Sequence, residues 1–70
     1  MATASPVSRR EVEVLTLLAN GKTARQISEI LGITKRTVDA HKHCVVAKLN
    51  AANSVQAVAI AVRDGFVDVE

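Results

Sequence analysis

Apolar residues recur every three or four positions along most of this chain, and the pattern breaks at short polar segments typical of helix ends. Four amphipathic helices are predicted in this way, over about residues 9–19, 24–31, 35–49 and 54–64. No segment shows the alternating pattern of a β-strand. The pattern therefore predicts an all-α fold, a compact four-helix bundle formed by residues 7–70.

A side chain that can cap a helix precedes each predicted helix. The expected caps are Ser8, Thr23, Thr34 and Asn53. Glu11 and Gln26, three residues after the first two caps, complete capping boxes, and Gln56 follows Asn53 at the same distance. These residues place the four helix starts independently of the apolar pattern.

The apolar spacing also predicts which side of each helix faces the core. In the first helix this side is formed by Val12, Leu15, Leu18 and Ala19, widened by Val14 and Leu17. In the second it is formed by Ile27, Ile30 and Leu31, and in the third by Val38, His41, Val45 and Leu49. Phe66 and Val67 are expected to fold back onto this core.

Residues 24–41 have the pattern of a helix-turn-helix. Ser28 is small enough to let a second helix pass closely, and Gly32 gives the turn a permissive backbone. Ile33 follows as an apolar plug, and Val38 points inward from the next helix. Since the second helix of this motif lies in the major groove of DNA, the stretch predicts DNA binding.

The fourth predicted helix is apolar on nearly all sides. One side, with Ala57, Val58 and Ala61, is expected to pack on the core. A domain this small cannot also bury the other side, which indicates a partner, most simply a second copy in a symmetric dimer. The alternative is an alanine-rich surface without a partner. The expected dimer contacts are Val55, Gln56, Ala59, Ile60 and Arg63.

Composition narrows the class of protein. Phe66 is the single aromatic residue among 70, which argues against binding of single-stranded nucleic acid by stacking. One cysteine cannot form a disulfide within the chain, so a reducing, cytoplasmic setting is expected. No signal-peptide pattern is present, and the longest apolar run, 55–62, is far below the ~20 residues that span a membrane.

The net charge of +2 is distributed unevenly. Residues 22–48 hold six lysine and arginine residues against two acidic ones, whereas the rest of the chain holds three against five. The positive charge thus lies on the candidate motif, as a surface that faces phosphate requires. A solvated face with a chance asymmetry is the alternative.

The third helix carries the candidate DNA contacts. Asp39, Ala40 and His43 share its exposed face, where they can meet base edges: a carboxylate accepts from cytosine, a methyl contacts thymine, and an imidazole donates to guanine. The dipole at the N-terminus of this helix also favours phosphate. The expected phosphate contacts are Lys22, Thr23, Thr34, Lys35, Arg36, Thr37 and Lys42. An ordinary amphipathic surface helix is the alternative.

Other chemistry finds little support. His41 and His43 point in nearly opposite directions on a helix, so they cannot hold a metal together, and His41 is expected to pack inward with one nitrogen hydrogen-bonded. Cys44 is expected to be a small buried residue rather than a redox sensor. The sequence shows no arrangement of a nucleophile with a general base, and it contains no glycine-rich phosphate loop. We therefore expect no enzyme activity, no cofactor or metal, and no small-molecule ligand in this domain.

From Val7 to Val67 the chain resembles the LuxR-type helix-turn-helix family of bacterial transcription regulators. The matching segments are Ser8–Glu11, Gly21–Thr23, Gln26–Ser28, Leu31–Ile33, Thr37–His41, Lys48–Leu49 and Gln56–Val58. The resemblance implies a third helix in the major groove, a fourth helix that dimerises, and base contacts at Asp39, Ala40 and His43. Many members carry lysine or arginine where Asp39 and His43 stand. Asp39 is therefore expected to pair with a cation such as Lys35 or Arg36, so that it does not repel phosphate.

The resemblance also implies a context. In this family the domain is usually the output of a longer chain with a receiver or an autoinducer pocket, and the segment 48–59 looks more like the autoinducer-responsive, quorum-sensing branch. Residues 1–6 are expected to be a disordered tail or linker remnant, or the start of a single-domain regulator. The predicted function is sequence-specific binding of double-stranded DNA as a homodimer, with RNA polymerase a further candidate partner. The alternative is a protein-interaction module of the same shape that docks polymerase or another regulator.

Overall fold

The computed structural model describes residues 7–69, which form four α-helices and no strand. The helices are α1 (Arg9–Ala19), α2 (Ala24–Leu31), α3 (Lys35–Lys48) and α4 (Ser54–Arg63). The predicted all-α fold is confirmed, and α3 and α4 each end one residue before the expected limit. The tail expected at residues 1–6 lies outside the described residues. None of the described helices is long and apolar enough to cross a membrane.

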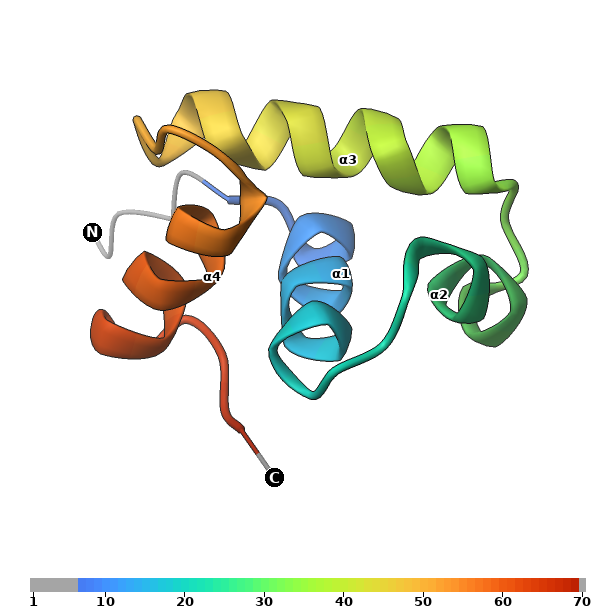
Figure 1. The fold of residues 1–70 in the computed structure, drawn as a ribbon, viewed down its shortest axis with the longest axis horizontal. Helices are drawn as coiled ribbons and strands as arrows, with labels where there is room; N and C mark the ends of the chain where they lie inside the picture. The colour runs from blue at the N-terminus through green and yellow to red at the C-terminus, as the bar shows by residue number, and fades with distance from the viewer. Residues whose placement is uncertain (1–6, 70) are drawn as a thin grey trace.

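The helix α3 lies across the other three, and α1 lies between α2 and α4 (Figure 1). Both α1 and α3 pack against every other helix, whereas α2 and α4 do not touch each other. This arrangement leaves α2 and the first half of α3 together at one end of the molecule, with α4 and the second half of α3 at the other.

The core is accordingly divided into two clusters. The turn cluster joins α1, α2 and α3 through Val14, Ile27 and Val38, which are fully buried. The α4 cluster joins α1, α3, α4 and the residues that flank α1 and α4. Its buried members are Val7, Leu15, Val45, Ala57, Ala61 and Val67. The predicted return of Phe66 and Val67 to the core is confirmed.

The buried face of α1 includes all six predicted residues, but it is divided between the two clusters. Val14 and Leu15 are its fully buried residues, whereas Val12, Leu18 and Ala19 are only partly buried. The reason is that α1 is wedged between two helices, so that Val14 faces the turn cluster and Leu15 the α4 cluster. A pattern that assumes one apolar stripe cannot find two buried sides.

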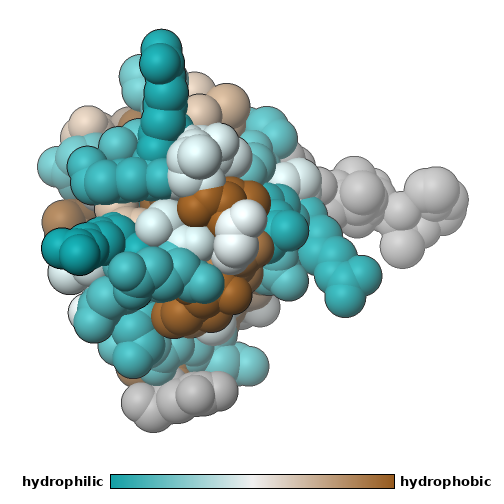
Figure 2. Space-filling view, turned by 90° about the vertical axis from the view of Figure 1, so that its right-hand side faces the viewer, coloured by the Kyte–Doolittle hydropathy of each residue, from teal (hydrophilic) through white to brown (hydrophobic). Residues whose placement is uncertain are grey.

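In α2 the expected stripe is also corrected. Ile27 is fully buried and Leu31 half-buried, but Ile30 is 55% exposed. Because α2 is short and contacts only α1 and α3, it leaves part of its apolar surface uncovered. Figure 2 faces this end of the molecule and shows apolar surface between hydrophilic side chains.

The first helix begins with a capping box and an apolar clamp. The Ser8 hydroxyl accepts from the Glu11 backbone N–H at 3.2 Å, and the Glu11 carboxylate accepts from the Ser8 N–H at 2.9 Å. Val7, just before the cap, and Val12 both pack in the α4 cluster, as in a hydrophobic staple. The sequence analysis identified the box but missed Val7 as a core residue.

Candidate nucleic-acid interface

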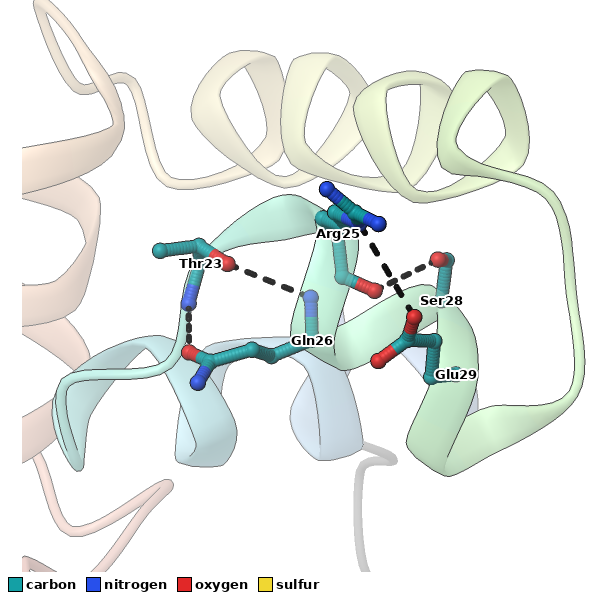
Figure 3. Close-up of polar contacts among 5 residues, drawn as sticks. All are labelled: Thr23, Arg25, Gln26, Ser28 and Glu29. Atoms are coloured by element: carbon teal, nitrogen blue, oxygen red, sulfur yellow. Dashed lines mark hydrogen bonds and ion pairs between the residues drawn. The ribbon is translucent and has the colours of Figure 1, made fainter.

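The second helix begins with the predicted capping box (Figure 3). The Thr23 hydroxyl accepts from the Gln26 N–H at 3.2 Å, and the Thr23 N–H donates to the Gln26 side chain at 2.9 Å. The Ser28 hydroxyl donates to the Arg25 carbonyl at 2.6 Å, so this polar group is satisfied within the helix. These local bonds fix the start of α2.

The turn between α2 and α3 has the predicted construction. Gly32 has a left-handed backbone with φ of 69°, which glycine adopts without strain, and its N–H bonds to the Ser28 carbonyl. Ile33 packs against the turn cluster. Thr34 then caps α3, because its hydroxyl accepts from the Thr37 N–H at 3.1 Å.

The outward face of α3 carries the three predicted base-edge residues. Asp39, Ala40 and His43 are all exposed, whereas Val38 and Val45 on the opposite side are fully buried. The inward side of α3 therefore packs in the turn cluster through Val38 and in the α4 cluster through Val45, and its other side is exposed. Since α3 has 14 residues, it is about 21 Å long and reaches well beyond the ~12 Å width of a major groove.

Cations occupy the first turn of α3, where acidic residues would stabilise the helix. Lys35 and Arg36 are its first two residues, and this turn contains no acidic side chain. Positive charge at the positive end of a helix dipole is unfavourable for the helix itself. The same placement creates a strong attraction for an anion, so these two residues suit a ligand better than they suit the fold.

Asp39 is paired with two of the predicted phosphate contacts. Its carboxylate lies 3.6 Å from the Lys35 ammonium and 4.0 Å from that of Lys42. Pairing with Lys35 is as predicted, but the second partner is Lys42 and not Arg36. Arg36 is exposed and makes no ion pair with any residue of the described part of the chain.

The remaining predicted phosphate contacts lie at two helix starts. Lys22 and Thr23 are exposed on the connection into α2. The side chain of Thr23 is hydrogen-bonded to the backbone of Gln26 in α2 and not to a residue of α3. Thr34 and Thr37 lie together, with their hydroxyl oxygens 2.9 Å apart. The structure thus gathers Lys35, Asp39 and Lys42 in one cluster and Thr34 and Thr37 in another.

Two neighbours of the outward face were missed by the sequence analysis. Cys44 was expected to be buried, but it is exposed, because it precedes Val45 by one residue and is turned about 100° away from the buried stripe. It follows Ala40 by one helical turn, and Ala47 follows His43 in the same way. Both residues therefore extend the exposed face towards the end of α3.

His41 lies on the opposite side, as predicted, and is half-buried. The hydrogen bond expected for one of its nitrogens is not found within residues 7–69. Helical spacing places His41 on the same side of α3 as the buried residues Val38 and Val45.

A partly buried ion pair anchors the far end of α3. Glu11 is only 5% exposed, and its carboxylate receives the Lys48 ammonium at 2.8 Å. Burial alone would raise the pKa of Glu11, but the hydrogen bond and charge of Lys48 and the two hydrogen bonds from Ser8 outweigh it, so the pKa is lowered. The sequence analysis counted Lys48 in the positive charge of residues 22–48 but did not foresee its pairing with Glu11. No local signal links two residues 37 positions apart.

A groove runs between α3 and the start of α4. Its volume is about 390 Å³, and it is lined by Asp39, Lys42, His43, Val46, Ala52, Asn53 and Ser54. Asp39 therefore lies at the edge of a shallow depression that is open to solvent. The predicted cap of α4 is confirmed, since the Asn53 side chain accepts from the Gln56 N–H at 2.8 Å.

The side of α4 expected to dimerise is largely exposed. Val55 is 77% exposed, Val62 is 40% exposed, and Ala59 lies on the same side between them. Gln56 and Arg63 are also exposed, and the Arg63 side chain pairs with Asp64 at 3.1 Å. Ile60 is half-buried, so the apolar strip centres on Val55, Ala59 and Val62 rather than on Ile60.

Comparison with known proteins agrees with this geometry. Residues 5–61 match the family described as bacterial regulatory proteins, luxR family. The chain is 46% identical over 61 residues to the transcriptional activator protein SolR of Ralstonia solanacearum, covering 87% of this chain and 26% of SolR. The structure of the transcription factor GerE matches with a TM-score of 0.89 at 29% identity, covering 94% of this chain and 98% of GerE.

A complex of Vibrio cholerae VqmA with a ligand and DNA also matches, with a TM-score of 0.81 and 30% identity. The match covers 94% of this chain and 29% of VqmA. The chain thus spans less than a third of SolR and of VqmA but nearly all of GerE.

Proposed function

The chain belongs to the LuxR family of bacterial regulatory proteins and forms its helix-turn-helix DNA-binding domain, and we propose that it binds double-stranded DNA sequence-specifically with α3 in the major groove. The family is one of transcriptional regulators, which confirms the expectation of a protein that is not an enzyme. The observation that carries the proposal is the first turn of α3, where Lys35 and Arg36 oppose the helix dipole.

The proposed contacts follow from exposure and charge. Asp39, Ala40 and His43 face base edges, while the cations and hydroxyls at the starts of α2 and α3 face phosphates. The proposed phosphate contacts are Lys22, Thr23, Thr34, Lys35, Arg36, Thr37 and Lys42. Among them Arg36 is expected to contribute most, because it is exposed and pairs with no described acidic residue.

A salt series tests this interface. Arg36→Ala should weaken binding to any duplex and reduce the dependence of log K on log salt by roughly 0.9, the value of one lost phosphate contact. Arg63→Ala, which removes the same charge from the last turn of α4, should leave the slope on a duplex with one half-site unchanged. Equal slopes for the wild type and both variants would reject α3 as the DNA-binding helix.

We further propose that α4 joins two copies on DNA through Val55, Gln56, Ala59, Ile60 and Arg63, with Val62 as an added contact. Two copies would occupy half-sites about one helical turn, ~34–36 Å, apart. Because Ile60 is half-buried, Val55 is the better residue to test. Val55 lies in the first turn of α4, where a carboxylate stabilises the helix through its dipole. The variant Val55→Glu should therefore keep the fold.

The variant should bind one half-site normally and lose cooperative binding to an inverted repeat. Val69→Glu is the matched control, since Val69 is 58% exposed and lies outside α4. Titrations of one-site and two-site duplexes, with sedimentation of the complexes, would measure the difference. Retained cooperativity in Val55→Glu would exclude this face as the dimer surface.

The biological setting stays a proposal as well. We place the protein in the cytoplasm, as a regulator of bacterial transcription. An autoinducer-responsive, quorum-sensing role rests on the resemblance of residues 48–53 and 56–59 to that branch of the family. The region shared with the transcriptional activator SolR is 26% of that protein. We propose no sensor domain or signal from this domain itself, which spans 26% of SolR and 29% of VqmA.

A second candidate function is docking to another protein. The supporting observation is an apolar groove of about 280 Å³ between α1 and α2, lined by Val12, Glu13, Thr16, Leu17, Ile30 and Leu31. RNA polymerase or another regulator could bind there. The same salt series separates the two functions, because a protein groove of this kind would leave duplex DNA weakly bound at every salt concentration.

A further inference from the structure

The one acidic residue of α3 lies in the middle of its proposed DNA-binding surface. Asp39 is flanked by Lys35, one turn earlier, and by Lys42, nearly one turn later, and pairs with both. We propose that Asp39 is an internal counter-ion that lowers the affinity for DNA in general and thereby raises the preference for the correct sequence. This inference rests on the proposed function of α3.

The geometry makes the two pairs easy to exchange. The N–O distances of 3.6 and 4.0 Å exceed those of a strong charge-assisted hydrogen bond, about 2.7–2.9 Å. Lys35 precedes Asp39 by four residues, which is the weaker order for such a pair on a helix. The side chains of Lys35 and Asp39 are 64% and 50% exposed, so solvent already screens their attraction.

Docking on DNA changes the partners of this cluster. Phosphate oxygens can replace the carboxylate at Lys35, whose side chain is 64% exposed, and at Lys42, whose side chain is 27% exposed. Asp39 then loses its partners and is held near phosphates, where its charge is repelled or must recruit a cation from solution. On DNA of arbitrary sequence this cost is not recovered.

A matching base pair offsets the free energy that Asp39 loses when its ion pairs are broken. Asp39 is exposed on the same face as Ala40 and His43, so its released carboxylate can accept from an amino group at a base edge, such as that of cytosine. The groove beside Asp39, between α3 and the start of α4, leaves room for the side chain to move. The exchange is therefore favourable at one class of sequence and unfavourable at the others.

The test is Asp39→Asn, which keeps the shape of the side chain and removes its charge. Binding is measured to a random-sequence duplex and to a duplex selected from a random pool by the wild-type domain. We expect the variant to bind the random duplex several-fold more tightly, with a salt slope steeper by about 0.9. The preference for the selected duplex should fall about tenfold, within the range that one base pair carries.

Glu13→Gln is the control, because Glu13 loses the same charge on α1, where it pairs with Arg10 at 3.2 Å. Thermal melting of both variants checks the fold. If Asp39→Asn changes random-duplex affinity and slope no more than Glu13→Gln does, Asp39 is not a counter-ion of the interface. If the wild type itself binds duplex DNA without salt dependence, the proposed function fails instead, and the two results are distinct.

Discussion

The two ends of α3 differ in what surrounds them. At the first end, Lys35 and Asp39 form an exposed pair at 3.6 Å, and the side that faces solvent carries charge and hydroxyls. At the other end Lys48 reaches the buried carboxylate of Glu11 at 2.8 Å, with Val45 fully buried beside it. One helix thus has a loosely paired surface at its start and an anchored end.

This difference separates function from stability along a single element. Exposed pairs contribute little to folding, so the charges at the start of α3 can be chosen for a ligand. The pair of Glu11 with Lys48 and the α4 cluster hold the helix from its other end, and the turn cluster fixes its inward side. The face of α3 that we propose for DNA binding is thereby left free of packing.

The largest effect is expected from breaking the turn cluster. Ile27→Ala should lower the free energy of unfolding by about 2–5 kcal/mol, because Ile27 is fully buried and the neighbouring helices cannot close the gap. A domain of this size is only marginally stable, so much of it should be unfolded at 37 °C. Ile30→Ala on the same helix, where the side chain is 55% exposed, should cost far less in urea unfolding. Similar losses would mean that α2 does not pack as described.

The anchored end is tested at Glu11. Glu11→Gln keeps the bond to the Ser8 N–H but removes the charge that Lys48 meets, and should cost about 1–2 kcal/mol. Glu13→Gln, which breaks an exposed pair on the same helix, should cost almost nothing. The comparison is made by urea unfolding near neutral pH.

The same pair gives the domain a defined acid dependence. The folded-state pKa of Glu11 is lower than its usual value of 4.5, so the native state binds fewer protons than the unfolded state. The stabilisation is therefore complete above about pH 4.5 and is lost as the pH falls through the folded-state pKa. The wild type and Glu11→Gln should converge in stability on acidification. A constant difference across this range would assign the effect to packing.

The sequence could predict interactions between residues close together in the chain but not those between distant residues. The caps at Ser8, Thr23 and Thr34, and the pair of Asp39 with Lys35, join residues three or four positions apart, and all were predicted. The pair of Glu11 with Lys48 depends on how α1 meets α3, which no local pattern contains.

The burial of individual side chains was hardest to predict where it depends on how many helices surround the element. Ile30 was misjudged because α2 contacts only two helices, which sets the exposure of its side chain. Cys44 was misjudged because it lies at the edge of a stripe. Of the candidate site, exposure at Asp39, Ala40 and His43 could be predicted from helical spacing, whereas the second partner of Asp39 could not.

A smaller effect is expected at the turn itself. Thr34→Ala removes the hydroxyl that accepts from the Thr37 N–H and should cost about 1 kcal/mol. Thr34→Ser keeps the acceptor and should cost only a fraction of that. Thermal melting of the two variants tests whether the cap holds the start of α3. Equal stability of Thr34→Ala and the wild type would show that the Thr34 cap contributes nothing to stability.

The smallest effect on stability is expected at Lys35, and it sharpens the comparison most. Lys35→Ala breaks an exposed pair and removes a cation that opposes the helix dipole, so stability should change by less than about 0.5 kcal/mol. Lys48→Ala makes the same substitution at the anchored end and leaves the Glu11 carboxylate buried without its partner, so it should destabilise clearly. In duplex titrations the order should invert: Lys35→Ala should reduce the salt slope by about 0.9, whereas Lys48→Ala should leave it unchanged. If both variants lose the same stability, or if Lys48→Ala alone alters the salt slope, the division of α3 into a free start and an anchored end is wrong.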